Sequence, residues 1–407
     1  MTDWSLLPED FLRLILDKLS SPLDNARSGA VCKLWHSICK QKTFPWLLPP
    51  DPDPVHHKLC LFSLSDQEVY HIKLPELENK VIWGASHGWL VTMDEDFFVC
   101  LLDPFSKTQI QLPQNLKVNK RLPLRKVVMS SDPRTNPNGC IIMACTYCGL
   151  AYCRLGGKEW TPFPAMGYQI IDFTFCKGQF YARYYHGLFI CHIDSEPYFT
   201  QLPPKNLQMD YLVDLAGDLL MINRFVQCET PAKVLENVHE SDEEGDETED
   251  DASSDVFREN EHESHDEDAD DEIEDGLKGF GKCPFQRQDY AYVDHLTCCF
   301  SVFKLDEKGT SWTKVNDIGD QALLLGSKNS VALPTCSFPG CARNAIYYAD
   351  KYWLANDRVV FNEVGNFHLK DRRIHSRHVF DVYEYNAYHQ RPPPIWFVQG
   401  SLQLPES

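Results

Sequence analysis

The chain contains 407 residues, of which 43% are hydrophobic and 12% aromatic, which is enough to bury a substantial core and excludes a wholly disordered protein. The net charge of −20 is concentrated in residues 236–275, where 22 acidic residues accompany a single base, Arg258. The rest of the chain holds 37 acidic and 38 basic residues. This balance lacks the broad basic face that phosphate neutralisation requires, so nucleic acid is not expected as a partner.

The first residues carry acids at Glu9 and Asp10 instead of a basic region before an apolar core, so we expect no secretory signal. No uninterrupted apolar run approaches the roughly 20 residues of a membrane-spanning helix, and a membrane is not expected as a partner. We therefore expect a protein of the nucleus, the cytoplasm or both. Its 16 cysteines are expected to be reduced and mostly buried.

Residues 1–45 predict two or three short helices. Pro8 suits a first helical position, and Glu9 and Asp10 complement the helix dipole. Two sets of apolar residues then recur at helical spacing: Phe11, Leu12, Ile15, Leu16 and Leu19, and later Ala30, Val31, Leu34, Trp35 and Ile38. Because so short a segment buries little surface by itself, a partner is expected to cover it.

Three blocks of this segment resemble the F-box: Leu7-Pro8-x-Asp10, Ile15-Leu16-x-x-Leu19 and Val31-Cys32-Lys33-x-Trp35. In that family the helices interleave with a Skp-type adaptor, which bridges to a cullin and a ubiquitin-conjugating enzyme. The resemblance implies an apolar adaptor-binding surface made of Leu7, Pro8, Ile15, Leu16, Leu19, Val31, Cys32 and Trp35. Ser28, where many relatives carry a bulky apolar residue, and Gly29, which costs a helix about 1 kcal/mol relative to alanine, predict weaker adaptor binding. The residues alone also fit a helical cap packed on the chain's own large domain.

The periodicity changes after Pro45. Four prolines predict a stiff linker over residues 46–57. Beyond it, short β-branched and aromatic runs between turn signals predict strands over 58–63, 69–74, 81–83, 89–92, 97–102, 127–130, 140–146, 170–175, 179–184, 188–193, 211–215, 219–225 and 300–305.

The strands favour an all-β propeller. At ~45 residues per four-stranded blade, about 310 ordered residues predict six or seven blades, whereas one sandwich would be far too large. Its two parts are expected over 58–235 and 276–400. The turn segments 86–90 and 176–180 are similar to one another, although no strict repeat is seen.

Several motifs in this region resemble the plant domain of unknown function numbered 295, a KIB-type β-propeller. They are Leu101-Leu102-Asp103-Pro104-Phe105, Ile110-x-Leu112-Pro113, Phe300-x-Val302-Phe303-Lys304-Leu305-Asp306, Trp312, the segment 319–326, Gly340-Cys341-x-x-Asn344-x-Ile346-Tyr347-Tyr348 and Trp396-Phe397. The family commonly carries an N-terminal F-box, and the resemblance implies a substrate receptor. Because Asp103-Pro104 and Gly319-Asp320 are turn signals beside apolar runs, we interpret these motif residues as structural.

Residues 236–275 carry too many like charges to pack and predict a disordered acidic loop inside the propeller. Such an insertion costs little stability, because loop closure grows only with the logarithm of length. Ser241, Thr248 and Ser264 each precede an acid by three positions, which would suit a phosphorylation platform. In so acidic a segment this spacing also arises by chance, and the loop could be only a solvated spacer.

No pattern indicates catalysis, a cofactor or a metal. Cys145-Thr146-Tyr147-Cys148, near Cys153, has one half of a zinc-type spacing without a second pair, so we interpret these cysteines as core residues on adjacent strands. The histidines, His375 and His378 among them, are expected in loops or polar tracts. No nucleophile elbow, P-loop or dinucleotide-binding glycine pattern occurs.

The sequence therefore predicts a non-catalytic substrate-recognition subunit of an SCF-type cullin ubiquitin ligase. Its F-box would bind a Skp-type adaptor, and its propeller would hold an unidentified protein target near the conjugating enzyme. One alternative is a non-ligase scaffold or transcription-associated binder that uses the acidic loop. A hydrolase or metalloenzyme built on a propeller is the other.

Overall fold

In the computed structural model, the described residues are 7–19, 24, 27, 28, 34, 35, 38, 45–49, 58–63, 68–116, 118, 124–146, 148–166, 170–193, 196–202, 211–226, 296–338, 340–353, 360–382 and 393–398. The expected acidic loop over 236–275 lies outside them. No helix among these residues is long and apolar enough to cross a membrane.

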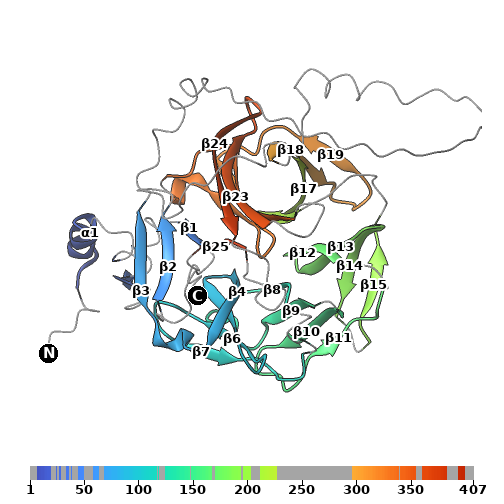
Figure 1. Ribbon diagram of the computed structural model, residues 1–407, viewed down its shortest axis with the longest axis horizontal. Coiled ribbons are helices and arrows are strands. Elements are labelled where there is room, and N and C mark those ends of the chain that lie inside the picture. Colours follow the sequence, from blue (N-terminus) through green and yellow to red (C-terminus); the bar gives the residue numbers. More distant parts are fainter. Residues whose placement is uncertain are drawn as a thin grey trace, which may run out of the picture.

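Six sheets are arranged as the blades of a closed ring (Figure 1). Blade 1 contains β25 (Ile395–Val398), β1 (Pro45–Leu48), β2 (Lys58–Ser63) and β3 (Val69–Lys73). Blade 2 contains β4 (Lys80–Ser86), β5 (Trp89–Asp94), β6 (Val99–Leu102) and β7 (Gln109–Gln111). Blade 3 contains β8 (Lys126–Met129), β9 (Ile141–Thr146), β10 (Gly149–Arg154) and β11 (Thr161–Pro162).

The other three blades complete the ring. Blade 4 contains β12 (Ile170–Cys176), β13 (Gln179–Tyr184), β14 (Gly187–His192) and β15 (Tyr198–Gln201). Blade 5 contains β16 (Tyr211–Leu215), β17 (Asp218–Val226), β18 (Thr297–Leu305) and β19 (Trp312–Val315). Blade 6 has five strands in the order β21 (Val331–Pro334), β20 (Gln321–Leu325), β22 (Ala345–Trp353), β23 (Val360–His368) and β24 (Arg373–Val382). Two 3-10 turns, Pro75–Leu77 and Thr335–Ser337, lie between strands.

The propeller thus has six blades, within the expected six or seven. Its core forms between neighbouring blades: one apolar cluster joins blades 2 and 3, another joins blades 3 and 4, and a third joins blades 5 and 6. Each blade has two buried faces because it packs on both neighbours. The innermost strands therefore read as nearly continuous apolar runs, such as the YLV at the start of β16.

Two-residue turns link the innermost strand to the next in blades 2, 4 and 5. His87, Lys177 and Ala216 have φ of 49°, 49° and 50°, and a glycine with positive φ follows each. Such turns suit the twist of a β-hairpin and favour glycine. They explain why the segments 86–90 and 176–180 are similar in sequence.

The ring is closed by strands from the two ends of the chain. β25 pairs antiparallel with β1 in the register Pro45↔Val398 to Leu48↔Ile395. The expected linker over 46–57 therefore begins within a strand. Four residues followed by prolines are too few to show the alternation from which a strand is recognised.

Buried charges tie blade 5 to blade 6. The Arg224 guanidinium donates to Glu363 at 3.0 Å and lies 3.4 Å from the Asp350 carboxylate. Glu363, which is fully buried, also accepts hydrogen bonds from the Thr297 backbone, the Thr297 hydroxyl and the Tyr348 hydroxyl. Burial by itself would lower the pKa of Arg224, but Tyr211, Asp350 and Glu363 raise it above its usual value, so it stays charged.

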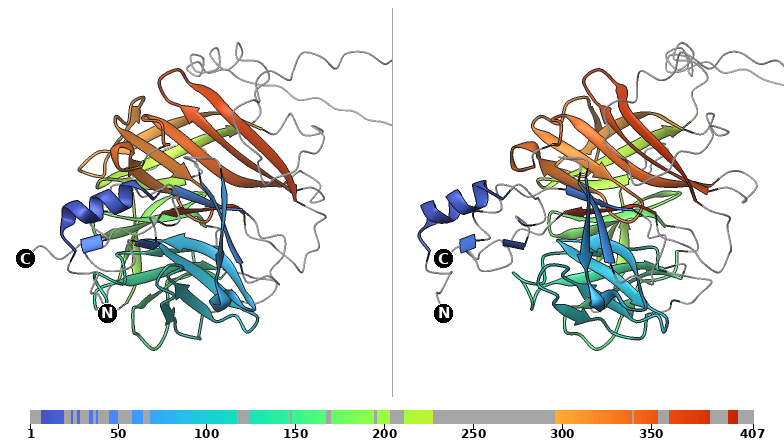
Figure 2. Two further views of the ribbon diagram at one scale, coloured as in Figure 1. Left: turned by 90° about the vertical axis from the view of Figure 1, so that its left-hand side faces the viewer. Right: turned by 60° about the vertical axis from the view of Figure 1, so that its left-hand side comes forward.

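Residues 1–45 are described in part. One bounded helix, α1 (Glu9–Asp17), stands to one side of the ring (Figure 2), and isolated helical residues follow between 24 and 38. An all-helical F-box is therefore not shown by the described residues.

Candidate functional site

A small apolar cluster holds the helical segment together. It consists of Leu12, Leu16, Trp35 and Ile38, all buried, with Leu7, Leu19 and Leu34 packed against them. None of these described members lies on a strand. All of them except Leu7 come from the two apolar sets that the sequence places at helical spacing.

The structure separates the predicted adaptor-binding residues into groups. Leu16 and Trp35 face inward, at 2% and 8% exposure. Leu7, Ile15 and Leu19 are half-buried, and Pro8, which precedes α1, is exposed. The last two predicted residues, Val31 and Cys32, lie outside the described residues.

Two large apolar side chains point away from this cluster. Phe11 and Leu14 are 61% and 60% exposed, and residues three apart lie on the same face of a helix. Arg13 and Glu9 form an ion pair of 2.6 Å, also exposed. Phe11 was recognised in the sequence as part of the apolar stripe but not as a site residue. Leu14 was missed, because the F-box pattern directs attention to its neighbours at 15 and 16.

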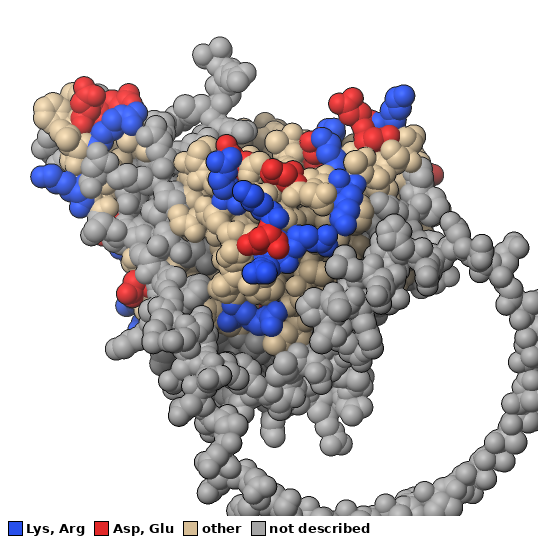
Figure 3. Space-filling model, turned by 90° about the horizontal axis from the view of Figure 1, so that it is seen from above, with Lys and Arg blue, Asp and Glu red and all other residues tan. Residues whose placement is uncertain are grey.

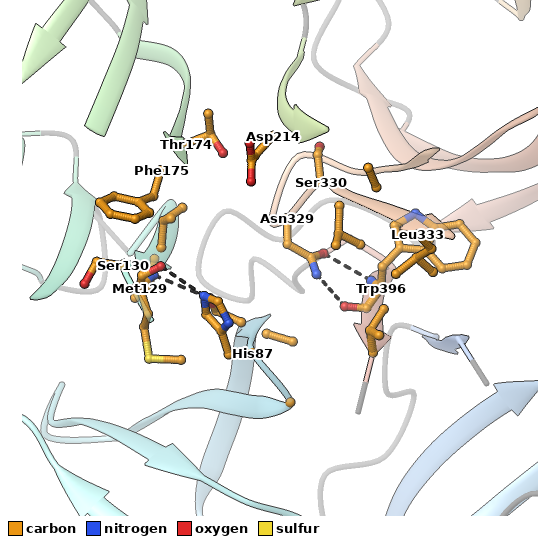
Figure 4. Close-up of a pocket in the computed structure, with 18 of the residues that line it drawn as sticks. His87, Met129, Ser130, Thr174, Phe175, Asp214, Asn329, Ser330, Leu333 and Trp396 are labelled. Carbon is orange, nitrogen blue, oxygen red and sulfur yellow. Dashed lines mark hydrogen bonds between the residues drawn. The ribbon is translucent and has the colours of Figure 1, made fainter. Parts of the chain in front are cut away.

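The propeller contains a cavity of about 660 Å³ at its centre (Figure 4). It is lined by the ends of the innermost strands, including Ser86 of β4, Phe175 of β12, Asp214 of β16 and Val398 of β25. We call the side of the ring where these strands end the cavity face. Because Pro45 pairs with Val398, the helical segment joins the propeller on this same face.

The cavity walls mix apolar and polar groups. Trp396, Leu333 and Phe175 supply apolar surface, and Thr174 and Ser330 supply hydroxyl groups. At the rim, the Asp214 carboxylate accepts hydrogen bonds from the Gly217 backbone at 2.9 Å and from the Cys176 thiol at 3.0 Å. Such a lining suits binding of a mixed polar and apolar ligand.

His87 stands at the rim with its ring turned inward (Figure 4). Although the residue keeps exposed surface, the protein groups that surround the ring in the cavity desolvate it and lower its pKa below the ordinary 6.5, so the imidazole is neutral at pH 7. Its Nε2 lies 3.2 Å from the Met129 carbonyl oxygen, which can only accept a hydrogen bond. Nε2 therefore carries the proton and donates it.

A short loop of blade 6, residues 326–330, crosses the centre of the ring. The Lys328 ammonium donates to the carbonyl oxygens of Leu124 and Arg125 in blade 3, at 3.4 and 2.7 Å, and lies 4.6 Å from the centre of the Trp83 ring in blade 2. Asn329 donates to the Trp396 carbonyl and accepts from the Trp396 N–H, as a neighbouring strand would. The loop thus joins blades 1, 2, 3 and 6 beneath the cavity.

Asp103, the central residue of a predicted family motif, has a structural role. It is 3% exposed, accepts the backbone N–H groups of Phe105 and Ser106, and pairs with Arg134 of the next blade at 3.1 Å. Asp132 binds the same guanidinium and the indole N–H of Trp89. The interpretation that this motif residue is structural agrees with these contacts.

The structure confirms the expected burial of some cysteines and contradicts the expected position of two histidines. Cys145 and Cys153 are buried on β9 and β10, as expected, whereas Cys148 is exposed. His375 and His378 lie on strand β24, so their placement in loops was wrong. Among the described residues, no group of three or more His, Cys, Asp or Glu side chains could hold a metal ion.

The architecture is that of a six-bladed propeller with a central cavity and an N-terminal helical segment. The model of the KIB1-4 beta-propeller family matches residues 61–381, and the chain belongs to that family. The resemblance to plant F-box proteins with a KIB-type propeller is thereby confirmed.

Curated relatives from Arabidopsis thaliana extend over almost the whole chain. It is 22% identical to "F-box protein SKIP23", over 97% of this chain and 95% of that protein. It is 23% identical to "Putative F-box protein At1g65770", over 86% of this chain and 90% of that one, and 21% identical to "F-box protein At2g26160", over 86% and 96%.

Proposed function

We propose that this chain is the substrate-recognition subunit of an SCF-type cullin ubiquitin ligase in the nucleus or cytoplasm. The helical segment would bind a Skp-type adaptor, and the cavity face would bind the protein target. The chain itself would perform no covalent step, since its contribution is to hold the target near a conjugating enzyme.

The observation that carries the adaptor proposal is the exposed apolar pair Phe11 and Leu14. The four-residue core beneath them is small and buries little apolar surface. A partner that covers the exposed pair would therefore stabilise the helical segment. Leu16 and Trp35 would then support the surface from within. Adaptor contact would fall on Phe11 and Leu14, with the half-buried Leu7, Ile15 and Leu19 beside them.

Co-purification of the full chain with a Skp-type adaptor tests this assignment. Phe11→Asp with Leu14→Asp is expected to weaken binding at least about tenfold, because two buried apolar contacts would be lost. Tyr185→Asp, which changes a side chain of 70% exposure on the propeller, is the matched control. Equal binding by the wild type and both variants, or no binding by any, would contradict the proposal.

The cavity face supports the target proposal because it lies on the side where the helical segment joins. Ser330→Arg would place a long charged side chain at the cavity wall and is expected to reduce capture of targets that accumulate when the proteasome is inhibited. Adaptor binding should persist in that variant. Tyr185→Arg, outside the cavity lining, should leave both interactions intact.

A further inference from the structure

Cys60 and His71 form a hydrogen-bonded pair on the outer strands of blade 1. They are directly opposite each other in the register of β2 and β3, and the Cys60 Sγ lies 3.2 Å from the His71 Nδ1. The Cys60 residue is half-buried and His71 is exposed. An imidazole at this distance can take the thiol proton.

Two lysines flank the pair. Lys58 and Lys73 are also directly opposite each other, two residues along each strand, so strand alternation places them on the same face as Cys60 and His71. Like charges opposite each other across two strands are unfavourable. Neither ammonium has an ion-pair partner in the part of the chain that the structure describes, so an anion bound between them would relieve the repulsion.

Among the described residues, no other cysteine has a histidine as its hydrogen-bond partner. Burial raises the pKa of Cys145 to about 11 and that of Cys153 to about 12, which makes both thiols poor nucleophiles. Cys148 and Cys336 are exposed, but no described histidine lies within hydrogen-bond distance of either. These two exposed cysteines are therefore natural internal controls.

We propose that Cys60 is a modification site, at which the thiol exchanges with anionic small-molecule disulfides. The Cys60 proton would move to His71 Nδ1, and the thiolate would attack one sulfur of the disulfide. A new S–S bond forms as the old one breaks, and the leaving thiolate takes a proton from the imidazolium or from water. The incoming disulfide is the only co-reactant that this exchange requires.

Site-resolved mass spectrometry of the full-length chain would test the proposal. The probes are glutathione disulfide, which is anionic, and cystamine, which is cationic. With glutathione disulfide, Cys60 is expected to react roughly tenfold faster than Cys148 and Cys336, because a nearby base and cationic groups favour the thiolate. With cystamine, the ratio of the Cys60 rate to the Cys148 and Cys336 rates should be smaller, because Lys58 and Lys73 repel a cationic probe.

Two exposed-site variants separate the contributions. His71→Gln should slow modification of Cys60 by roughly tenfold with both probes, since the proton acceptor is lost. Lys58→Gln with Lys73→Gln should reduce the preference for the anionic probe alone. The proposal is overturned if wild-type Cys60 reacts no faster than Cys148 and Cys336, or if His71→Gln leaves its rate unchanged.

Discussion

Arg224 and Glu363 show how much a single buried charge contributes between blades. Glu363 is fully buried and receives hydrogen bonds from blade 5 through Arg224 and Thr297 and from its own blade through Tyr348. Glu363 is the closer and more deeply buried of the two carboxylates that balance the Arg224 charge. Removing it leaves the guanidinium with Asp350 as its remaining anionic partner, at 3.4 Å in a low-dielectric site.

Glu363→Gln is therefore expected to destabilise the propeller by about 3–5 kcal/mol, which urea unfolding at pH 7 would measure. Arg343→Gln is the matched control, because its ion pair with Asp320 is exposed at 73% and 66%. Loss of that surface pair should change stability by less than about 1 kcal/mol. Similar losses in the two variants would show that the buried pair has no special role.

The lowered pKa of His87 predicts acid sensitivity. The folded state prefers the neutral ring, whereas the unfolded chain takes up a proton near pH 6.5. The contribution of His87 to the free energy of unfolding is therefore fully present above pH 6.5. It decreases as the pH falls below that value, because the unfolded chain then binds the proton more readily than the folded one. Thermal unfolding between pH 7.5 and 5.5 should show a shallower loss for His87→Asn than for the wild type, and parallel curves would refute the assignment.

Individual site residues were predictable only where a pattern specifies them. Helical spacing placed Leu12 and Leu16 on one apolar stripe and Trp35 and Ile38 on another, and the structure packs the two stripes into one cluster. Spacing does not tell which side of a short helix faces a partner, so the exposed Phe11 and Leu14 were not singled out. The Cys60–His71 pair depends on strand register, which the separate runs 58–63 and 69–74 do not specify.

At the level of elements, the sequence predicted the hairpins well and the ring closure poorly. Strands β2, β13 and β16 have the expected bounds, because their alternation and turn residues are local signals. β1 and β25 have four residues each and are recognised only through their pairing. The parallel contact between β20 and β22 likewise depends on the chain forming β21 on one side of β20 and then crossing to its other side.

The closure strand should be sensitive to truncation of one side chain. Trp396 is fully buried in β25, and its indole donates to the Leu325 carbonyl at 2.8 Å. Trp396→Ala is expected to cost about 3–5 kcal/mol, whereas Ile395→Val on the same strand should cost about 0.5–1.5 kcal/mol. Denaturant titration would measure the free energy of unfolding of both variants. Equal losses of stability would argue against a special role for the indole where β25 pairs with β1.

For the whole molecule, charge is distributed unevenly along the chain. Basic and acidic side chains are interspersed on the described surface seen in Figure 3, whereas residues 236–275 account for all of the net negative charge. Val226 and Thr297, which pair at the ends of β17 and β18, lie at the ends of these strands away from the cavity face. The segment between them therefore enters and leaves the propeller on the opposite side from the helical segment.

Deleting residues 236–275 is expected to leave adaptor binding unchanged and to increase self-association at low salt. The remaining chain would have nearly balanced charge, and proteins near zero net charge associate more readily. Light scattering would measure this, with a scrambled acidic segment of the same composition as control. Loss of adaptor binding on deletion would instead favour the scaffold function built on the acidic segment.

The pairing of β1 with β25 has a consequence for folding during translation. At about 5–20 residues per second, the ribosome delivers β25 roughly 20–70 s after β1, because roughly 350 residues separate them. During that interval the first blade lacks its innermost strand and exposes an unpaired edge. A nascent chain is thus vulnerable to misfolding until β25 emerges, and a premature stop codon anywhere before it would leave the ring open.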